Sequence, residues 1–228
     1  MKLEISEVIM VLDRSGSMGP IRDATIEVMN KFLVEQRAVQ GVGRFTLAQF
    51  DHEYESVYEA VDLERVPYFS DRNYEPRGGT ALYDAIADTI DSADRRISQL
   101  AVQDRPTKVI FIVVTDGYEN SSKRHGERAV REKIERQKKK DWQFVFIGAN
   151  LDAQAVAKNI AIPISNALQF GHNMVGTSNA IRSASNLVAQ YRSGMGGQSL
   201  GGFSEEDRLM AMSDESSTDS KPEVKKSP

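Results

Sequence analysis

The sequence of 228 residues contains no cysteine, a single tryptophan and only three histidines. Without cysteine, disulfide bonds, thiolate catalysis and cysteine-based zinc sites are excluded. No apolar run approaches the roughly 18 residues that a membrane-spanning helix needs. Residues 1–7 carry acidic side chains where a secretory signal would be basic and apolar. These absences predict a cytoplasmic protein that makes no membrane contact.

Basic residues are also slightly fewer than acidic ones. The chain has 29 Lys and Arg against 33 Asp and Glu, and a formal net charge of −4. A weakly acidic protein lacks the electrostatic attraction that supports non-specific nucleic-acid binding, so nucleic acid is not expected as a partner. Hydrophobic residues make up 40% of the chain, which is enough to form a sizeable core. The length predicts one domain with a tail.

Three short apolar runs predict strands. They are 8–12, 109–114 and 144–147, and they are rich in β-branched and aromatic residues without polar alternation. Runs of this kind are too short for helices and are typical of strands that are buried on both faces of a parallel sheet. Residues 44–51 and 54–61 alternate around a short turn and predict a hairpin with one antiparallel edge strand.

Helical periodicity separates these strands. Apolar residues recur at steps of three and four after Pro20, a favoured first helical residue, and the run ends at Gly41. A second stripe runs from Leu82 to Leu100. Further helices are expected near 126–140, 151–160 and 173–192. The resulting order, β-α-β-β-α-β-α-β-α-β-α, predicts a three-layer α/β sandwich with a Rossmann-like, mostly parallel sheet.

The composition changes from residue 193 onward. Five glycines lie between Gly194 and Gly202, and a run of Ser, Asp, Glu and Lys follows. Such a composition offers little to bury and predicts a flexible, disordered tail. Within it, Ser204-Glu205-Glu206-Asp207 has the capping-box pattern that opens a short helix. The predicted domains are therefore 1–192 and a tail of 193–228.

Oxygen-bearing side chains follow the predicted strands at one sheet edge, where open α/β sheets bind ligands. Asp13, Ser15 and Ser17 alternate along the loop after the first strand. Thr80 follows a glycine pair at the start of the second helix, where it could cap that helix, and Asp116 follows the central strand. Five hard oxygen donors without imidazole or thiolate favour Mg²⁺ or Mn²⁺ over Zn²⁺. If the three hydroxyls ligate directly and the carboxylates act through water, the metal stays electrophilic toward an outside carboxylate.

The set Asp13-x-Ser15-x-Ser17, Thr80 and Asp116 resembles the metal-ion-dependent adhesion site (MIDAS) of von Willebrand factor A domains. All five positions match, in the order and between the elements that this family shows, and the resemblance covers about residues 4–192. It implies an α/β sandwich that holds one Mg²⁺ or Mn²⁺ ion, grips an acidic residue of a partner protein and is not an enzyme. The absence of cysteine and of a signal sequence favours the intracellular bacterial or phage-like type over secreted members.

By the same resemblance, partners of such domains include AAA+ ATPases and components of stress or mobile-element systems. The loops around the site are expected to set partner choice. The flanking residues are Arg14, Met18, Arg77, Tyr83, Tyr118, Glu119 and Asn120.

Two enzymatic alternatives stay open at this point. Ser15–Gly19 half resembles the nucleophile elbow of α/β-hydrolases, and Ser17, Asp116 and then His125 or His172 follow the hydrolase chain order. A metal-dependent phosphoesterase is the other alternative, although two carboxylates without a histidine cluster make a poor two-metal site. The three histidines show no ligand spacing. His52 is expected in the hairpin turn, and the other two near helix starts.

Overall fold

The protein is described by a computed structural model that covers residues 4–150, 152–194 and 199–214. The strands are β1 (Ile5–Asp13), β2 (Val42–Phe50), β3 (Tyr54–Asp62), β4 (Lys108–Thr115), β5 (Gln143–Ala149) and β6 (Ala167–Phe170). The α-helices are α1 (Arg22–Arg37), α2 (Leu82–Gln99), α3 (Glu127–Lys138), α4 (Ala153–Asn159), α5 (Met174–Ser193) and α6 (Glu205–Ala211). The element order up to α5 is the predicted one.

The strands form a single sheet in the order β3-β2-β1-β4-β5-β6. All neighbouring pairs are parallel except β2 and β3, so β3 is an antiparallel edge strand. This confirms the prediction of a mostly parallel sheet with one antiparallel edge strand. Strand β2 begins two residues earlier and ends one residue earlier than the alternating pattern indicated, and β3 ends one residue later.

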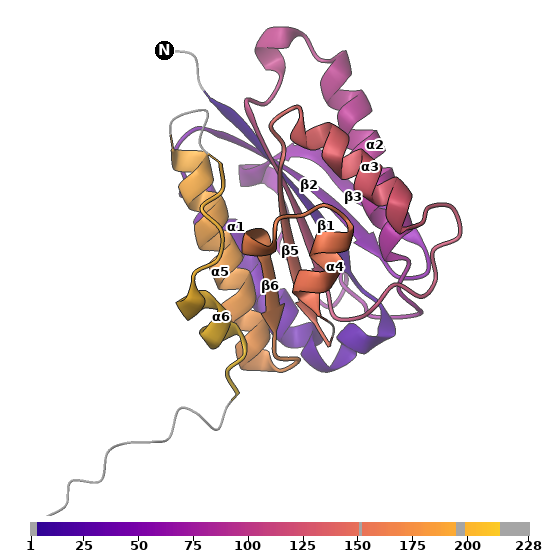
Figure 1. Cartoon of the computed structure of the whole chain (residues 1–228). Coiled ribbons are helices and arrows are strands. Elements are labelled where there is room, and N and C mark those ends of the chain that lie inside the picture. Colours follow the sequence, from indigo (N-terminus) through magenta and orange to yellow (C-terminus); the bar gives the residue numbers. More distant parts are fainter. Residues whose placement is uncertain (1–3, 151, 195–198, 215–228) are drawn as a thin grey trace, which may run out of the picture.

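Helices cover both faces of the sheet (Figure 1). Along β1, Val8, Met10 and Leu12 join the core beneath α1 and α5. The alternate residues Ile9 and Val11 join the core beneath α2, α3 and α4. Because successive strand side chains point to opposite faces, a strand between two helical layers must be apolar at every position. The uninterrupted apolar runs therefore arise, as predicted, from strands that are buried on both faces of the sheet.

The start of α1 differs from the prediction. Pro20 lies within a 3₁₀ helix, Gly16–Ile21, and α1 itself begins at Arg22. The tighter 3₁₀ turn buries the side chain of Met18 completely in the core between the sheet and α1. The chain therefore completes one tight turn after the first strand before the regular helix begins.

Part of the predicted tail packs against the domain. Ser204 caps α6, and both hydrogen bonds of the predicted capping box are present. The segment is held because Phe203 and Ala211 are buried in the core that lies beneath α5. Residues 199–214 are thus not the flexible tail that the polar composition indicated; residues 195–198 and 215–228 of that range lie outside the described residues. No helix in the described ranges is both long and apolar enough to cross a bilayer.

Candidate functional site

Strand pairing brings together the loop that follows β1 (the first loop) and the loop that follows β4 (the third loop). In the parallel register of β1 and β4, Leu12 lies beside Val114, so Asp13 and Thr115 end the two strands side by side. The Thr115 hydroxyl donates to Asp13 Oδ2 at 2.6 Å, and the backbone N–H of Ser15 donates to Asp13 Oδ1 at 2.6 Å. Asp13 is completely buried. Both of its carboxylate oxygens are therefore held in place by the ends of two adjacent strands.

The serines of the first loop face the carboxylate of the third. Ser15 Oγ and Ser17 Oγ lie 3.1 Å apart, and the Ser17 hydroxyl donates to Asp116 Oδ1 at 2.6 Å. Asp116 is 1% exposed and Ser15 is equally buried. The structure thus places the hydroxyls of both serines and the Asp116 carboxylate in one continuous row.

Thr80 lies beside Gly117, as Ser17 does. A Cβ atom built on Gly117 would be 3.8 Å from both Ser17 Oγ and Thr80 Oγ1, so the two hydroxyls flank the same stretch of backbone. Asn120 holds Thr80 there, because its side-chain oxygen accepts from the Thr80 backbone N–H at 2.8 Å. The expected capping role is wrong: the residue at the cap of α2 is Ala81, and no side chain caps the helix. The Thr80 hydroxyl is not used by the helix.

The glycine pair before Thr80 allows the close backbone approach that the sequence indicated. Gly78 has φ +66°, and a Cβ atom there would lie 2.1 Å from His52 Nδ1. The Gly16 backbone N–H donates to the Gly78 carbonyl at 3.0 Å. This hydrogen bond joins the first loop directly to the loop that precedes α2 (the second loop). Only glycine combines this positive φ with so little space.

The electrostatics of this cluster are unusual. Burial raises the pKa of Asp13 to about 6, although hydrogen bonds from Thr115 and Ser15 act in the opposite direction; the neighbouring charge of Asp116 raises it further. Within the described residues, no Lys or Arg side chain donates to either carboxylate. Two buried carboxylates and three hydroxyls therefore meet with no lysine or arginine to balance them.

His172 also belongs to the cluster, although sequence analysis named it only as a possible hydrolase histidine and not as part of the metal site. It follows β6, whose carboxyl end lies at the same sheet edge, and its Nε2 atom is 2.9 Å from Asp116 Oδ2 and 3.1 Å from the Ser17 carbonyl oxygen. The sequence placed it after Asp116 and near a helix start, and no spacing linked it to the five motif residues. The predicted element order includes a strand before the last helix, but this strand has only four residues and its bounds were not predicted.

Asp51 is a second missed residue, and it lies at the end of β2. Its Oδ2 atom accepts from Arg14 Nε at 3.1 Å and from Arg77 Nε at 2.8 Å. Arg14 belongs to the first loop and Arg77 to the second, so one completely buried carboxylate joins both. Burial by itself would raise the pKa of Asp51, but hydrogen bonds from Arg77 and Glu53 and the charges of both arginines lower it overall.

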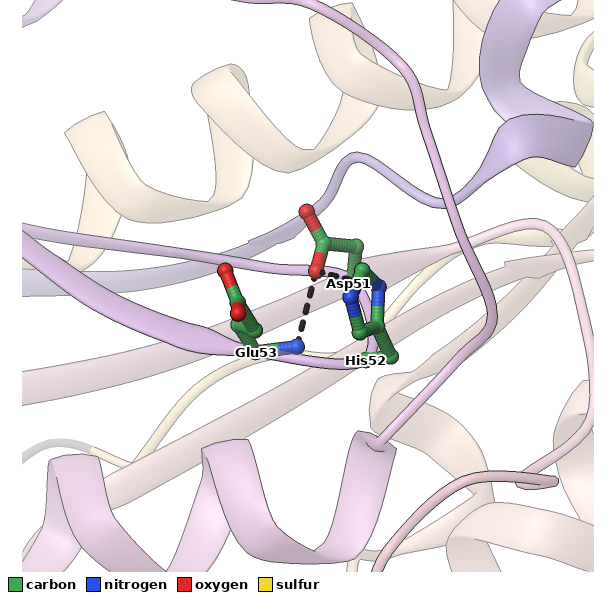
Figure 2. Close-up of side chains that lie close together, drawn as sticks. All are labelled: Asp51, His52 and Glu53. Carbon is green, nitrogen blue, oxygen red and sulfur yellow. Dashed lines mark hydrogen bonds and ion pairs between the residues drawn. The ribbon is translucent and has the colours of Figure 1, made fainter.

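The neighbouring side chains Asp51, His52 and Glu53 lie close enough together to hold a metal ion. Figure 2 shows, however, that the Glu53 backbone N–H and the His52 ring both face the same Asp51 oxygen, at 2.7 and 3.0 Å. The other Asp51 oxygen is taken by the two arginines. Because cations already surround this carboxylate, we interpret the trio as an ion-pair cluster that joins loops.

The residues expected to contact a partner fall into three groups. Arg77 and Tyr118 are about half exposed and form part of the surface. The prediction that Met18 is a surface residue is wrong, because its side chain is buried in the core.

The remaining flanking residues are engaged within the loops. Arg14 is mostly buried beside Asp51 and Glu55. Glu119 accepts from the backbone N–H groups of Tyr83, Ser121 and Ser122, and Asn120 accepts from that of Thr80.

Asp84 anchors the loop that carries Asn120, and it provides a pH-dependent test. Backbone N–H groups of 123–125 donate to its carboxylate, and these bonds lower its pKa although burial would raise it. A lowered pKa in the folded state stabilises the protein above the unfolded value of 3.8, and this contribution is lost as pH falls through the folded pKa. We expect Asp84→Asn to lower the free energy of unfolding by about 2 kcal/mol at neutral pH, and by less near pH 3.

Urea denaturation at both pH values measures this difference. The matched control is Asp71→Asn, because Asp71 is an exposed carboxylate. A deficit of equal size at both pH values would contradict the assignment, since the protonated carboxyl group and the amide then behave alike.

No family model matches the chain, and no curated protein sequence matches it. Three solved structures with related folds are proximal thread matrix protein 1 from the mussel byssus with a zinc-occupied MIDAS motif, the ArnB paralog VWA2 from Sulfolobus acidocaldarius, and a von Willebrand factor type A structure from Catenulispora acidiphila. Their TM-scores are 0.56, 0.53 and 0.52, and their identities are 16%, 17% and 16%.

Each of the three matches covers 82% of this chain. The matched part is less than half of the other protein, at 46%, 46% and 43% of its length. At this level of identity the likeness concerns the fold. Together with the sheet order and the flanking helices, it shows that this chain has the von Willebrand factor A fold.

Proposed function

We propose that this chain is a metal-dependent protein-binding domain. Asp13, Ser15, Ser17, Thr80 and Asp116 would hold one Mg²⁺ or Mn²⁺ ion at the carboxyl edge of the sheet. The ion supplies a Lewis-acidic position that accepts a carboxylate from an Asp or Glu of another protein. The partner class expected from the family resemblance, an AAA+ ATPase or a component of a stress or mobile-element system, belongs to this proposal, as does a cytoplasmic location.

The observation that carries the proposal is the pair of buried carboxylates that no lysine or arginine in the described ranges balances. Asp13 and Asp116 are both almost completely shielded from solvent, and no Lys or Arg in the described part of the chain donates to them. Buried carboxylates are normally paired with a cation or bound to a metal. The donor set contains hydroxyl and carboxylate oxygens, which suits Mg²⁺ or Mn²⁺. The zinc-occupied motif of the mussel protein supports a metal at this place in the fold.

The surface around the cluster suits recognition of an acidic partner. Arg77 has 52% of its side chain exposed and lies in the loop that leads to Thr80. Tyr118 is 57% exposed and follows Asp116 by two residues. A cation and an aromatic ring on opposite loops would contact a partner whose carboxylate reaches the metal, and exposed loop residues of this kind commonly determine specificity.

The geometry does not favour a serine hydrolase. In such an enzyme the histidine contacts the serine hydroxyl and the aspartate supports the histidine. Here the Ser17 hydroxyl donates directly to Asp116, whereas His172 contacts Asp116 and the Ser17 carbonyl oxygen. The ring of His125 lies 3.6 Å from the Asp88 carboxylate. Because neither of these histidines contacts the Ser17 hydroxyl, the arrangement supports a binding role over catalysis by Ser17.

Water-proton relaxation with Mn²⁺ tests both the ion and its open position. We expect the EDTA-stripped protein to bind one Mn²⁺ ion and to enhance relaxation, because the bound ion keeps exchangeable water. Added acetate, a minimal carboxylate, should then reduce this enhancement by replacing water. The absence of Mn²⁺ and Mg²⁺ binding in calorimetry would contradict the proposal. Turnover of generic phosphoesters in the same samples would support the phosphoesterase alternative in its place.

A further inference from the structure

The loop between β6 and α5 contacts the metal site from a direction that none of the five proposed ligands provides. His172 Nε2 lies within hydrogen-bonding distance of Asp116 Oδ2 and of the Ser17 carbonyl oxygen. A carbonyl oxygen only accepts hydrogen bonds, so Nε2 carries a proton and donates to both acceptors. The histidine thereby joins the first and third loops of the site.

The contact determines how Asp116 is oriented. Asp116 Oδ1 accepts from the Ser17 hydroxyl at 2.6 Å, and Oδ2 accepts from His172 at 2.9 Å. A carboxylate with one donor on each oxygen cannot rotate without losing one of them. Residues that orient ligands through hydrogen bonds increase metal affinity because they fix the site before the ion arrives.

The C-terminal segment 203–213 holds this loop in place. The Gly171 backbone N–H donates to the Ala211 carbonyl at 2.9 Å, and the Asn173 side chain donates to the Ser213 carbonyl at 3.3 Å. His172 lies between these two anchored residues. A Cβ atom on Gly176 would be 2.4 Å from the Gly171 carbonyl oxygen and 2.8 Å from that of Ala211. The first turn of helix α5 therefore packs closely against both Gly171 and Ala211.

Arg208 fixes the segment to the domain. Its guanidinium donates to the carbonyl oxygens of Ala167 at 2.7 Å and Ile164 at 3.2 Å. The Phe203 backbone N–H donates to the Ser165 carbonyl at 2.8 Å. Helix α6 therefore lies beside α5 and the edge strand β6, as Figure 1 shows. The contacts form a continuous path from Arg208 through the β6 edge and Ala211 to the loop that carries His172.

We propose that His172 is a positioning residue of the metal site and that segment 203–213 determines metal affinity by holding His172 against Asp116. The proposal rests on the proposed function, because it concerns the same ion. It adds to the site a fourth loop and a helix that lies outside the five-residue motif.

Three variants of His172 test the first part. We expect His172→Ala to weaken Mn²⁺ binding about tenfold in calorimetry, the lower end of the range for residues that orient metal ligands. His172→Gln should restore most of the affinity, because its amide nitrogen reaches the position of Nε2. His172→Asn should not, because its shorter amide reaches only the position of Nδ1. Unfolding temperatures in EDTA, measured for all four proteins, separate a general loss of stability from a loss of metal affinity.

A double-mutant cycle tests the second part. Arg208→Met keeps the apolar part of the side chain but removes its hydrogen bonds to the β6 edge. We expect this variant to weaken Mn²⁺ binding a few-fold, and to have no further effect when His172→Ala is present, because both act on one contact. Arg128→Met is the matched control, since its side chain is 92% exposed on α3, where it pairs with Glu132.

The outcomes separate the two proposals. Unchanged affinity in His172→Ala, or a Gln variant no better than Ala, would overturn the positioning role. Additive effects of Arg208→Met and His172→Ala would overturn the role of segment 203–213. If the unsubstituted chain binds no metal, both this inference and the proposed function fail, whereas tight binding in every variant overturns this inference alone.

Discussion

Replacing Asp13 with asparagine is expected to abolish metal binding and, at the same time, to make the metal-free protein more stable. The first effect follows because Asp13 is the buried carboxylate that begins the proposed ligand set. The second follows from its environment. Burial raises the pKa of Asp13 from 3.8 to about 6, so the ionised form is disfavoured in the folded protein.

The sign of the stability change follows from linkage. A folded-state pKa above the unfolded value means that the folded state binds more protons between the two values. The stability of the metal-free protein therefore falls as pH rises from about 4 to about 6, and at neutral pH the charge costs on the order of 2–3 kcal/mol. Asparagine carries no charge. Its side-chain oxygen can still accept from the Ser15 N–H, and its amide can donate to the Thr115 hydroxyl.

Calorimetric titration with Mn²⁺ and urea denaturation in EDTA measure the two effects on the same samples. We expect no saturable binding by Asp13→Asn and a gain of about 2 kcal/mol in its metal-free unfolding free energy at neutral pH. Asp71→Asn serves as the matched control, because it removes an exposed carboxylate and should change neither quantity. A variant that still binds the ion, or one that is less stable in EDTA, would contradict the assignment of Asp13.

Replacing Asp51 with alanine should have the opposite effect on stability. Arg14 has only 11% of its side chain exposed and would lose a buried partner. Removing one member of a buried ion pair typically costs about 3–5 kcal/mol. Because Arg77 is half exposed and Arg14 keeps its contact with Glu55, we expect a loss near the lower limit, about 3 kcal/mol.

Urea denaturation at neutral pH measures this loss, and Glu53→Gln is the control. Glu53 contacts Arg77 at the surface, where ion pairs contribute little, so the control should lose less than about 0.5 kcal/mol. An equal loss in both variants would contradict the distinction between a buried and an exposed partner.

The same pair of variants decides whether the trio of 51–53 holds a second ion. We expect the Mn²⁺ stoichiometry of folded Asp51→Ala and Glu53→Gln to equal that of the unsubstituted chain, since arginines and backbone N–H groups already occupy the Asp51 oxygens. The loss of one bound ion in both variants would identify the trio as a metal site instead.

Most of the fold could be predicted from local patterns. Strands buried between two helical layers require continuous apolar runs, and the runs at 8–12 and 109–114 became β1 and β4. The carboxyl ends of parallel strands lie at one edge, so Asp13, Thr80 and Asp116 could be expected together, and the structure brings their loops into contact. Their role as metal ligands stays a prediction that the titrations above test.

Other features were predicted incorrectly, because amino-acid composition does not show which residues pack against the domain. Segment 199–214 is mostly polar, yet three of its apolar residues, Leu200, Phe203 and Ala211, are buried in the core beneath α5. A short helix in a polar segment gains its stability from packing, which no local pattern describes. Met18 was misplaced for a related reason, since a 3₁₀ turn directs a loop residue into the core.

The sequence by itself determined the elements, their order and the five residues that share one edge of the sheet, because strand burial and helical periodicity are properties of neighbouring residues. Only the tertiary structure decided that His172 contacts Asp116, 56 residues away, and Ser17, 155 residues away. It also decided that Asp51 joins two arginines from different loops. Such contacts depend on where separate loops meet in space, and no spacing along the chain encodes that distance.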